Sequence, residues 1–103
     1  MKKFILIFRG GNVPADQQEK TNQDWFAWIG GLATKGVYKS GYPLAGGRVV
    51  TAAGTKAYKS AHNDVAGYGE IEATSLDVAV KIAKTAPNVK DGGTVEVREA
   101  IPM

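Results

Sequence analysis

The sequence predicts a single α+β domain in which two helices cover one face of an antiparallel sheet. Three observations support this fold class: short apolar or alternating segments typical of strands, two segments with apolar residues at helical spacing, and glycine-rich turns between them. The chain has 103 residues, of which 44% are apolar and 22% charged, as is typical of one globular domain. We therefore expect one core formed by residues 1–103.

The first strand is predicted over residues 3–9. An apolar run from Phe4 to Phe8 is closed by Arg9 and followed by Gly10-Gly11-Asn12, which favours a short buried strand. The run is too short for the apolar part of a signal peptide, and no other run approaches the ~18 residues of a membrane span. Because the chain has no cysteine, nothing indicates an oxidising compartment. We expect a cytoplasmic protein without a membrane segment.

A first helix is predicted between Pro14 and Gly36, where glycine can cap its C-terminus. Its apolar residues recur at the three- and four-residue spacing of one helix face. They are Trp25, Trp28, Ile29 and Leu32. Packing into the core explains the spacing of the two tryptophans without a further function, and stacking on a ligand is the alternative.

Two short strands are predicted over residues 37–44 and 48–53. The glycines of Ala45-Gly46-Gly47 allow a tight turn between them, so we expect the strands to pair as a hairpin. Residues 56–60 indicate a further short extended piece, which a polar loop over residues 61–66 follows.

The second half of the chain predicts a strand, a helix and a final strand. Residues alternate over 67–73 and 94–99 as in half-buried strands. Between them, Thr74 or Ser75 can cap a helix that Pro87 ends. Its apolar stripe consists of Leu76, Ala79, Val80 and Ala83. The element order βαββαβ is that of the ferredoxin-like fold, in which both helices lie on one face of the sheet.

The sheet face opposite the helices is expected to carry polar residues. They are Tyr68, Glu70, Glu72, Glu96 and Arg98. Such groups do not lie unpaired in a dry core, which leaves two interpretations. The face is solvated, as in many two-layer folds, or two chains pack face to face as a homodimer around a pocket for a small polar or anionic molecule.

Short motifs run through both halves of the chain. The first half contains Trp25-Phe26-Ala27-Trp28, Leu32, Gly36 and Ser40-Gly41-Tyr42-Pro43-Leu44. The second half contains Gly67-Tyr68, Ile71-Glu72-Ala73, Ser75-Leu76-Asp77, Ala79, Ile82-Ala83, Pro87 and Gly92-Gly93-x-Val95-Glu96-Val97-Arg98. With these motifs the chain resembles the YCII-related family, and its Asp-Gly-Pro-Phe branch in particular, nearly from end to end.

The resemblance implies a ferredoxin-like chain that pairs into a dimeric α+β barrel, with a ligand pocket at the sheet face opposite the helices. Most members of the family have no established activity, and an enzymatic role is linked to the branch with a His/Asp pair. The Asp-Gly-Pro-Phe segment aligns with Thr55-Lys56-Ala57-Tyr58, so Thr55 replaces the acidic residue. The charged positions that follow are Ser60 and His62-Asn63 here. The resemblance therefore favours binding over catalysis.

His62 and Asp64 are the candidate catalytic pair. Positions two apart share a face of an extended segment, so the Asp64 carboxylate could orient the imidazole as a base near neutral pH. The alternative is a solvated histidine in a polar loop. Arg9 and Arg48 can each hold an anion through the guanidinium group, or lie at the surface as most strand-end arginines do.

We expect no metal, cofactor or nucleic acid. One histidine and no cysteine leave carboxylates as the main metal ligands. Gly10-Gly11 lacks the flanking residues of a phosphate-binding loop. The thirteen Lys and Arg residues outnumber the ten Asp and Glu residues by three, but they are scattered from Lys2 to Arg98 and form no stripe.

Three functions remain open. The leading hypothesis is a small-molecule binding or sensing domain, a homodimer with a pocket at the sheet face. Its pocket residues would be Tyr42, Tyr68, Glu70, Glu96 and Arg98. The second is an enzyme of the lyase, isomerase or dehalogenase kind, with His62 as base and Arg98 or Arg9 stabilising an anion. The third is an accessory domain that binds another protein through the hairpin or an exposed helix face.

Overall fold

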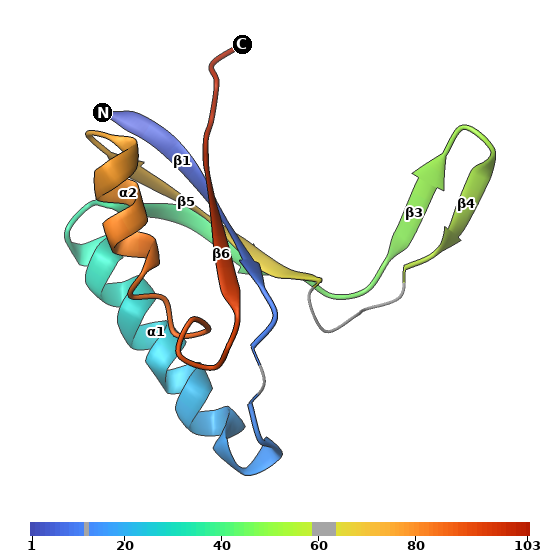
Figure 1. The fold of residues 1–103 in the computed structure, drawn as a ribbon, viewed down its shortest axis with the longest axis horizontal. Helices are drawn as coiled ribbons and strands as arrows, with labels where there is room; N and C mark the ends of the chain where they lie inside the picture. Colours follow the sequence, from blue (N-terminus) through green and yellow to red (C-terminus); the bar gives the residue numbers. More distant parts are fainter. Residues whose placement is uncertain (12, 59–63) are drawn as a thin grey trace.

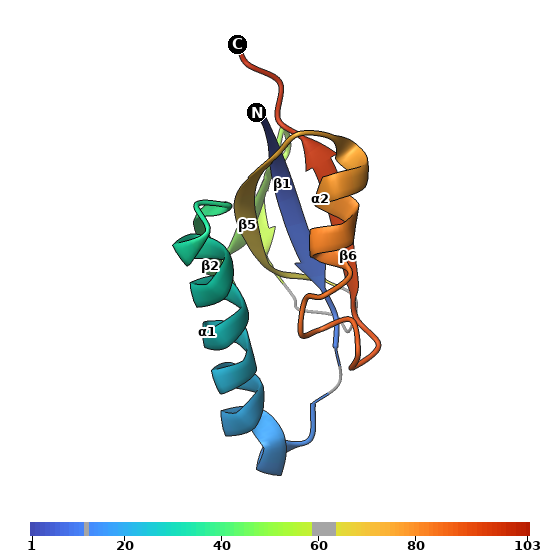
Figure 2. The same cartoon turned by 90° about the vertical axis from the view of Figure 1, so that its left-hand side faces the viewer.

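The computed structural model describes residues 1–11, 13–58 and 64–103. Its main sheet has four antiparallel strands in the order β2-β5-β1-β6, and both α-helices lie on one face of it (Figure 1 and Figure 2). This arrangement confirms the predicted ferredoxin-like α+β fold class. The elements are β1 (Lys2–Arg9), the 3₁₀ helix η1 (Ala15–Gln17), α1 (Gln18–Thr34), β2 (Tyr38–Pro43), β3 (Arg48–Thr51), β4 (Gly54–Ala57), β5 (Val65–Ala73), α2 (Leu76–Ala83) and β6 (Thr94–Glu99).

The core lies between the main sheet and the helices. Alternate residues of the central strand β1 are buried on the helix side. They are Phe4, Leu6 and Phe8. β5 contributes Ile71 and Ala73 to the same cluster, and α2 contributes Ala79 and Ala83. The period of two along a strand therefore assigns one face of the sheet to the core, as predicted.

The opposite face of the main sheet is called the outer face below. Its residues are Lys3, Ile5, Ile7, Ser40, Tyr42, Tyr68, Glu70, Glu72, Glu96 and Arg98. In the register of the strands, Ile5 lies between Glu70 and Arg98. Both isoleucines are half-buried, so a short apolar stripe runs along β1 between polar neighbours.

The helix α2 begins at the predicted cap. The Ser75 hydroxyl oxygen accepts a hydrogen bond from the Val78 backbone N–H at 3.3 Å, which satisfies a free donor of the first turn. Ala79 and Ala83 of the predicted apolar stripe are buried, whereas Leu76, the first helical residue, is 52% exposed. The buried stripe thus begins one turn later than predicted. Across the described ranges, no helix is both long and apolar enough for a membrane span.

The predicted hairpin between residues 37–44 and 48–53 is wrong. β2 pairs with β5 in the main sheet, and β3 pairs with β4 in a separate two-stranded ribbon. β2 joins the main sheet because Tyr38 then packs against the core, with its ring centroid 6.4 Å from that of Trp28. The ribbon turns at Gly54, whose φ of +136° favours glycine.

The ribbon of β3 and β4, residues 48–57, is called the arm below. It stands away from the body of the molecule, on the side of the main sheet opposite the helices (Figure 1 and Figure 2). No pair of Cα atoms within 8 Å joins the arm to another helix or strand of the described chain. The radius of gyration of 14.9 Å consequently exceeds the value of about 13 Å expected for a compact chain of this length.

Candidate functional site

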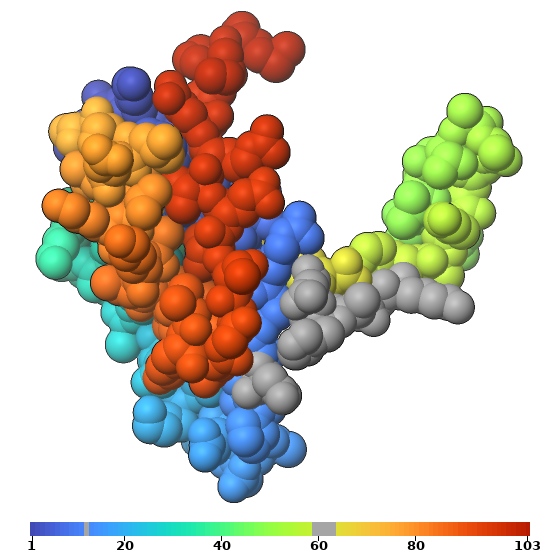
Figure 3. All heavy atoms as spheres, viewed as in Figure 1, coloured from blue at the N-terminus to red at the C-terminus, as the bar shows by residue number. Residues whose placement is uncertain are grey.

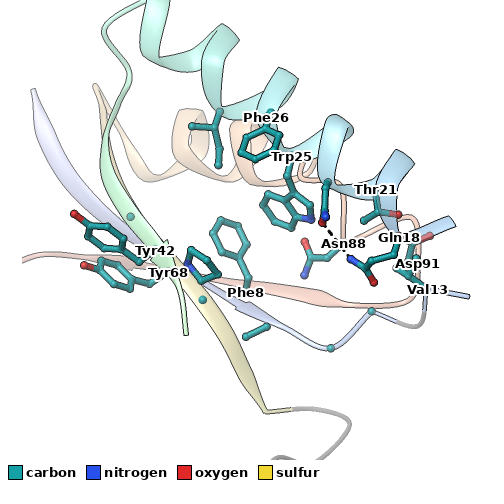
Figure 4. A pocket seen from close by; sticks show the side chains of 18 of the residues that line it. Phe8, Val13, Gln18, Thr21, Trp25, Phe26, Tyr42, Tyr68, Asn88 and Asp91 are labelled. Carbon is teal, nitrogen blue, oxygen red and sulfur yellow. Dashed lines mark hydrogen bonds between the residues drawn. The ribbon is translucent and has the colours of Figure 1, made fainter. Parts of the chain in front are cut away.

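A cavity of about 550 Å³ opens between the N-terminal half of α1 and the end of the sheet where β1 ends (Figure 4). Pockets for small molecules typically occupy roughly 300–1,000 Å³. The wall combines aromatic rings, glycines and neutral polar side chains. α1 contributes Gln18, Thr21, Asn22, Trp25, Phe26 and Ile29.

Glycines on the helix side of β2 and β5 allow the neighbouring strand and the Tyr38 ring to pack closely beside this cavity. They are Gly41, Gly67 and Gly69. A Cβ atom on Gly67 would lie 2.9 Å from the carbonyl oxygen of Tyr42, and one on Gly69 would lie 2.9 Å from a ring carbon of Tyr38. Real side chains do not approach so closely, so a larger residue would displace the neighbouring strand or ring. Of the three glycines, Gly41 and Gly67 line the cavity and place no side chain in it.

Three aromatic side chains hold α1 on the sheet beside the cavity. Phe8 of β1 contacts Trp25 and Trp28 edge to face, with ring centroids 4.9 and 5.9 Å apart, and the two indoles are 5.7 Å apart. Such pairs contribute about 0.5–1.5 kcal/mol each beyond the area they bury. Both tryptophans pack against the core cluster, as predicted. Trp25 also lines the cavity, so one side chain can serve both packing and ligand contact.

Two polar contacts fix α1 against the segment that follows α2. The Trp28 indole N–H donates to the Thr85 hydroxyl oxygen at 2.8 Å, and the Lys90 ammonium donates to the Asp24 carboxylate at 2.9 Å. The hydrogen bond from Lys90 holds the pKa of Asp24 below its usual value, and the same bond raises the pKa of Lys90. Solvent screens this ion pair, so it positions the segment more than it stabilises the fold.

Asn88 anchors the turn after α2 and carries an unsatisfied acceptor. The residue is 6% exposed, and its Nδ2 donates to the carbonyl oxygens of Arg9 at 3.3 Å and Thr94 at 3.0 Å. Its Oδ1 is buried without a hydrogen-bond partner in the described structure, as is Oδ2 of Asp91. Figure 4 shows the Asn88 oxygen directed toward α1 and the nitrogen toward the sheet. A buried acceptor without a donor costs about 1–3 kcal/mol, which a bound donor would recover.

The sequence patterns do not single out Asn88 or Asp91. Both follow Pro87 in a stretch typical of turns, and nothing in their spacing marks a carboxamide that bridges β1 and β6. The feature of the sequence that points to this contact is Gly93. A Cβ atom there would lie 2.6 Å from the Arg9 carbonyl oxygen and 2.8 Å from the Asn88 Nδ2, so glycine lets the asparagine reach both strands.

The charge of the cavity wall restricts what can bind. Among the described lining residues, Asp91 is the sole charged side chain, and no Lys or Arg would balance an anion. Burial, and secondarily the charge of Tyr68, raises the pKa of Tyr38, so this lining phenol stays neutral at pH 7. The sequence predicted a small polar or anionic ligand. The charge of this cavity wall favours a neutral polar molecule over an anion.

The structure brings two of the predicted ligand-binding residues, Tyr42 and Tyr68, to the edge of this cavity. Their ring centroids are 6.3 Å apart, and Figure 4 shows both rings on the other side of the strands from Phe8. The two tyrosines thus border the cavity from the edge of the sheet while their rings belong to the outer face.

The other predicted ligand-binding residues lie outside the cavity wall. On the outer face, Glu96 pairs with Arg9 at 3.8 Å and with Arg98 at 3.3 Å. Glu70 lies on the same face, and Arg48 lies on the arm. The predicted pocket between two facing sheets needs a second chain, so these residues stay candidates for that pocket.

The predicted catalytic pair stays untested, because His62 lies outside the described residues. Burial, and then a hydrogen bond with the Asp64 carboxylate, raises the pKa of the Tyr58 hydroxyl. Thr55, aligned with the carboxylate of the Asp-Gly-Pro-Phe segment, is exposed on β4 in the arm. Within residues 1–11, 13–58 and 64–103, no group of three His, Cys, Asp or Glu side chains could hold a metal ion. Catalysis by His62 stays a prediction.

A solved structure shares this fold. The chain is similar to 5-chloro-2-hydroxyhydroquinone dehydrochlorinase from Burkholderia phenoliruptrix, solved in complex with 2,5-dihydroxybenzoquinone. The TM-score is 0.60 over 97% of this chain and 95% of that chain, and the sequence identity is 19%. At this identity the likeness shows the fold alone. No family model matches the chain, and no curated protein matches it by sequence.

Proposed function

We propose that this chain is a small-molecule binding domain whose ligand lies in the cavity between α1 and the sheet. The observation that carries the proposal is the pair of buried acceptors, Asn88 Oδ1 and Asp91 Oδ2, in side chains that line a cavity with an aromatic wall. Folded proteins rarely leave buried polar atoms unpaired. A bound molecule with hydrogen-bond donors would account for both acceptors.

The expected ligand is a small ring that carries hydroxyl or amine donors. Phe8, Trp25 and Tyr38 offer apolar surface for the ring, and the turn after α2 offers acceptors for the donors. The 2,5-dihydroxybenzoquinone in the structurally similar protein is a hydroxylated ring, which supports a first test with this class. That compound ionises at neutral pH, whereas hydroquinone stays neutral. Since the described wall has no cationic side chain, hydroquinone is expected to bind more tightly here.

Calorimetric titration of the chain with hydroquinone tests the proposal. We expect saturable binding of one molecule per chain, and weaker binding after Phe26→Ala. Phe26 lines the cavity and is 77% exposed, so its truncation removes a ligand contact without opening the core. Loss of one aromatic contact of about 0.5–1.5 kcal/mol corresponds to binding about 2- to 12-fold weaker.

Leu76→Ala is the matched control for this titration. Leu76 is also an exposed apolar residue of a helix, at 52%, but it lies on α2 and outside the cavity wall. Its truncation should leave the affinity unchanged. The proposal fails if neither hydroquinone nor 2,5-dihydroxybenzoquinone nor 4-aminophenol binds at millimolar concentration, or if both truncations weaken binding equally.

We also infer that the chain is a YCII-related protein and forms a homodimer through the outer face. The motifs that run through both halves of the sequence and the ferredoxin-like fold support the family. The half-buried Ile5 and Ile7, flanked by polar residues, support the contact, because stable interfaces combine an apolar centre with a polar rim. Sedimentation at micromolar protein concentration measures the assembly, and a monomer there would refute the homodimer.

A further inference from the structure

We propose that the arm is a dimerisation clasp. When two chains pack outer face against outer face, the arm of each chain lies against the other copy. The inference rests on the homodimer proposed above and gives a role to a part of the chain that the cavity does not use.

The arm lacks support within its own chain. An isolated two-stranded ribbon is marginally stable in water. Both outer edges of this ribbon present backbone N–H and C=O groups that no other strand of the described chain pairs. Val50 is 76% exposed on a strand of four residues. A ribbon with so little burial is expected to keep its shape when a second surface covers it.

The arm stands where a facing chain would lie. Figure 1 and Figure 2 place it on the outer-face side of the main sheet, and Figure 3 shows an open notch between the arm and the body of the molecule. Two sheets that pack face to face lie about 10 Å apart, so a second copy on the outer face would enter this notch. In a twofold dimer every contact occurs twice, and both arms would therefore reach the other chain.

The charges of the arm and of the outer face also favour a second copy of the chain in the notch. The arm carries Arg48 and Lys56 and no acidic residue. On the outer face, Glu72 pairs with Lys39 at 3.7 Å. Glu70, which is half-buried, forms no ion pair with a cation of the described chain. A carboxylate that a dimer buries needs a cationic partner, and the arm of the second copy can supply one.

The geometry of the ribbon determines which arm residues face the other chain. Arg48 and Val50 lie two positions apart and share one face of the ribbon. Lys56, which pairs with Val49, lies on the opposite face. The first face combines a cation with an exposed apolar side chain, which complements Glu70 and the isoleucines of the outer face. We assign this face to the contact.

Sedimentation equilibrium of the full chain tests the clasp. We expect a wild-type dimer, and Arg48→Glu is expected to raise its dissociation constant about tenfold or more, because repulsion replaces a charge pair in the interface. Lys56→Glu makes the same charge change on the opposite face of the arm, and its effect should stay below about threefold. Combining Arg48→Glu with Glu70→Lys should restore the dissociation constant toward the wild-type value.

A monomeric wild-type chain, equal effects of the two arm substitutions, or no rescue by Glu70→Lys would each overturn the clasp. Arg48→Glu and Lys56→Glu should each keep the far-ultraviolet circular dichroism of the wild type, because the arm contacts no other helix or strand of the described chain. Hydroquinone titration of the same samples separates the two proposals. Intact binding with a failed clasp leaves the cavity function standing, and a dimer without hydroquinone binding refutes the cavity function alone.

Discussion

Leu6→Ala is expected to lower the free energy of unfolding by about 2–5 kcal/mol, the range for removing a large side chain from a packed core. Leu6 is 0% exposed in the central strand, with Gly69 and Val97 as its register partners on the flanking strands. Gly69 has no side chain that could move into the space left behind, and the Tyr38 ring over it is held by its packing against the core, so the cost should fall in the upper part of the range. Urea unfolding followed by tryptophan fluorescence measures the change.

Ile5→Ala is the control for this substitution, because Ile5 adjoins Leu6 but lies half-buried on the outer face. At concentrations where the chain is monomeric, it should cost less than half as much as Leu6→Ala. Equal costs would contradict the assignment of the two faces of β1. If the outer face forms the homodimer contact, the cost of Ile5→Ala should grow as the protein concentration rises.

Asn88→Asp is expected to destabilise the fold by about 3–5 kcal/mol at pH 7, as an unpaired buried charge does. The change keeps the size of the side chain but replaces the Nδ2 donor with an oxygen. That oxygen would face the carbonyl oxygens of Arg9 and Thr94, which the amide now satisfies. Three acceptors would then meet in a site that is 6% exposed in the native residue.

The loss of folding stability caused by Asn88→Asp should increase as pH rises. Burial raises the folded-state pKa of the introduced carboxyl above its unfolded value of about 3.9. Between these two pKa values the folded state binds more protons, so stability falls as pH rises. The difference from wild type should therefore be small near pH 4 and largest at pH 7. Asn22→Asp, an exposed substitution on α1, should show no such trend, and a pH-independent cost for Asn88→Asp would contradict the buried contact.

Much of the fold could be predicted because its elements are encoded locally. The alternation over residues 94–99 is sufficient to define β6, and Ser75 marks the start of α2 in the sequence and in the structure. The pairing of the strands, by contrast, could not be predicted from local sequence. The glycines at residues 46–47 fit a hairpin turn between two paired strands and a linker to the arm equally well. The choice between them depends on the packing of Tyr38 under α1, which is a tertiary contact.

The candidate site could be predicted only in part. Alternation predicted the polar residues of the outer face, including Tyr68 and Glu70. It could not predict the cavity, because the cavity depends on side chains that are missing at Gly41 and Gly67. The Asn88 contact with Arg9 joins residues 79 positions apart, and the available signal, Gly93, does not identify either partner in a single sequence.

The glycines of β2 and β5 have a consequence for motion. Glycine loses more conformational freedom on folding than other residues and gives a strand no side chain to pack, so this edge of the sheet should open locally more often than its centre. A ring bound beneath α1 would supply the missing contacts. The amides of Gly41 and Gly67 should then exchange with solvent deuterium more slowly when the cavity is filled. Binding at this site would thus appear as a stiffer sheet edge, with no rearrangement of the fold.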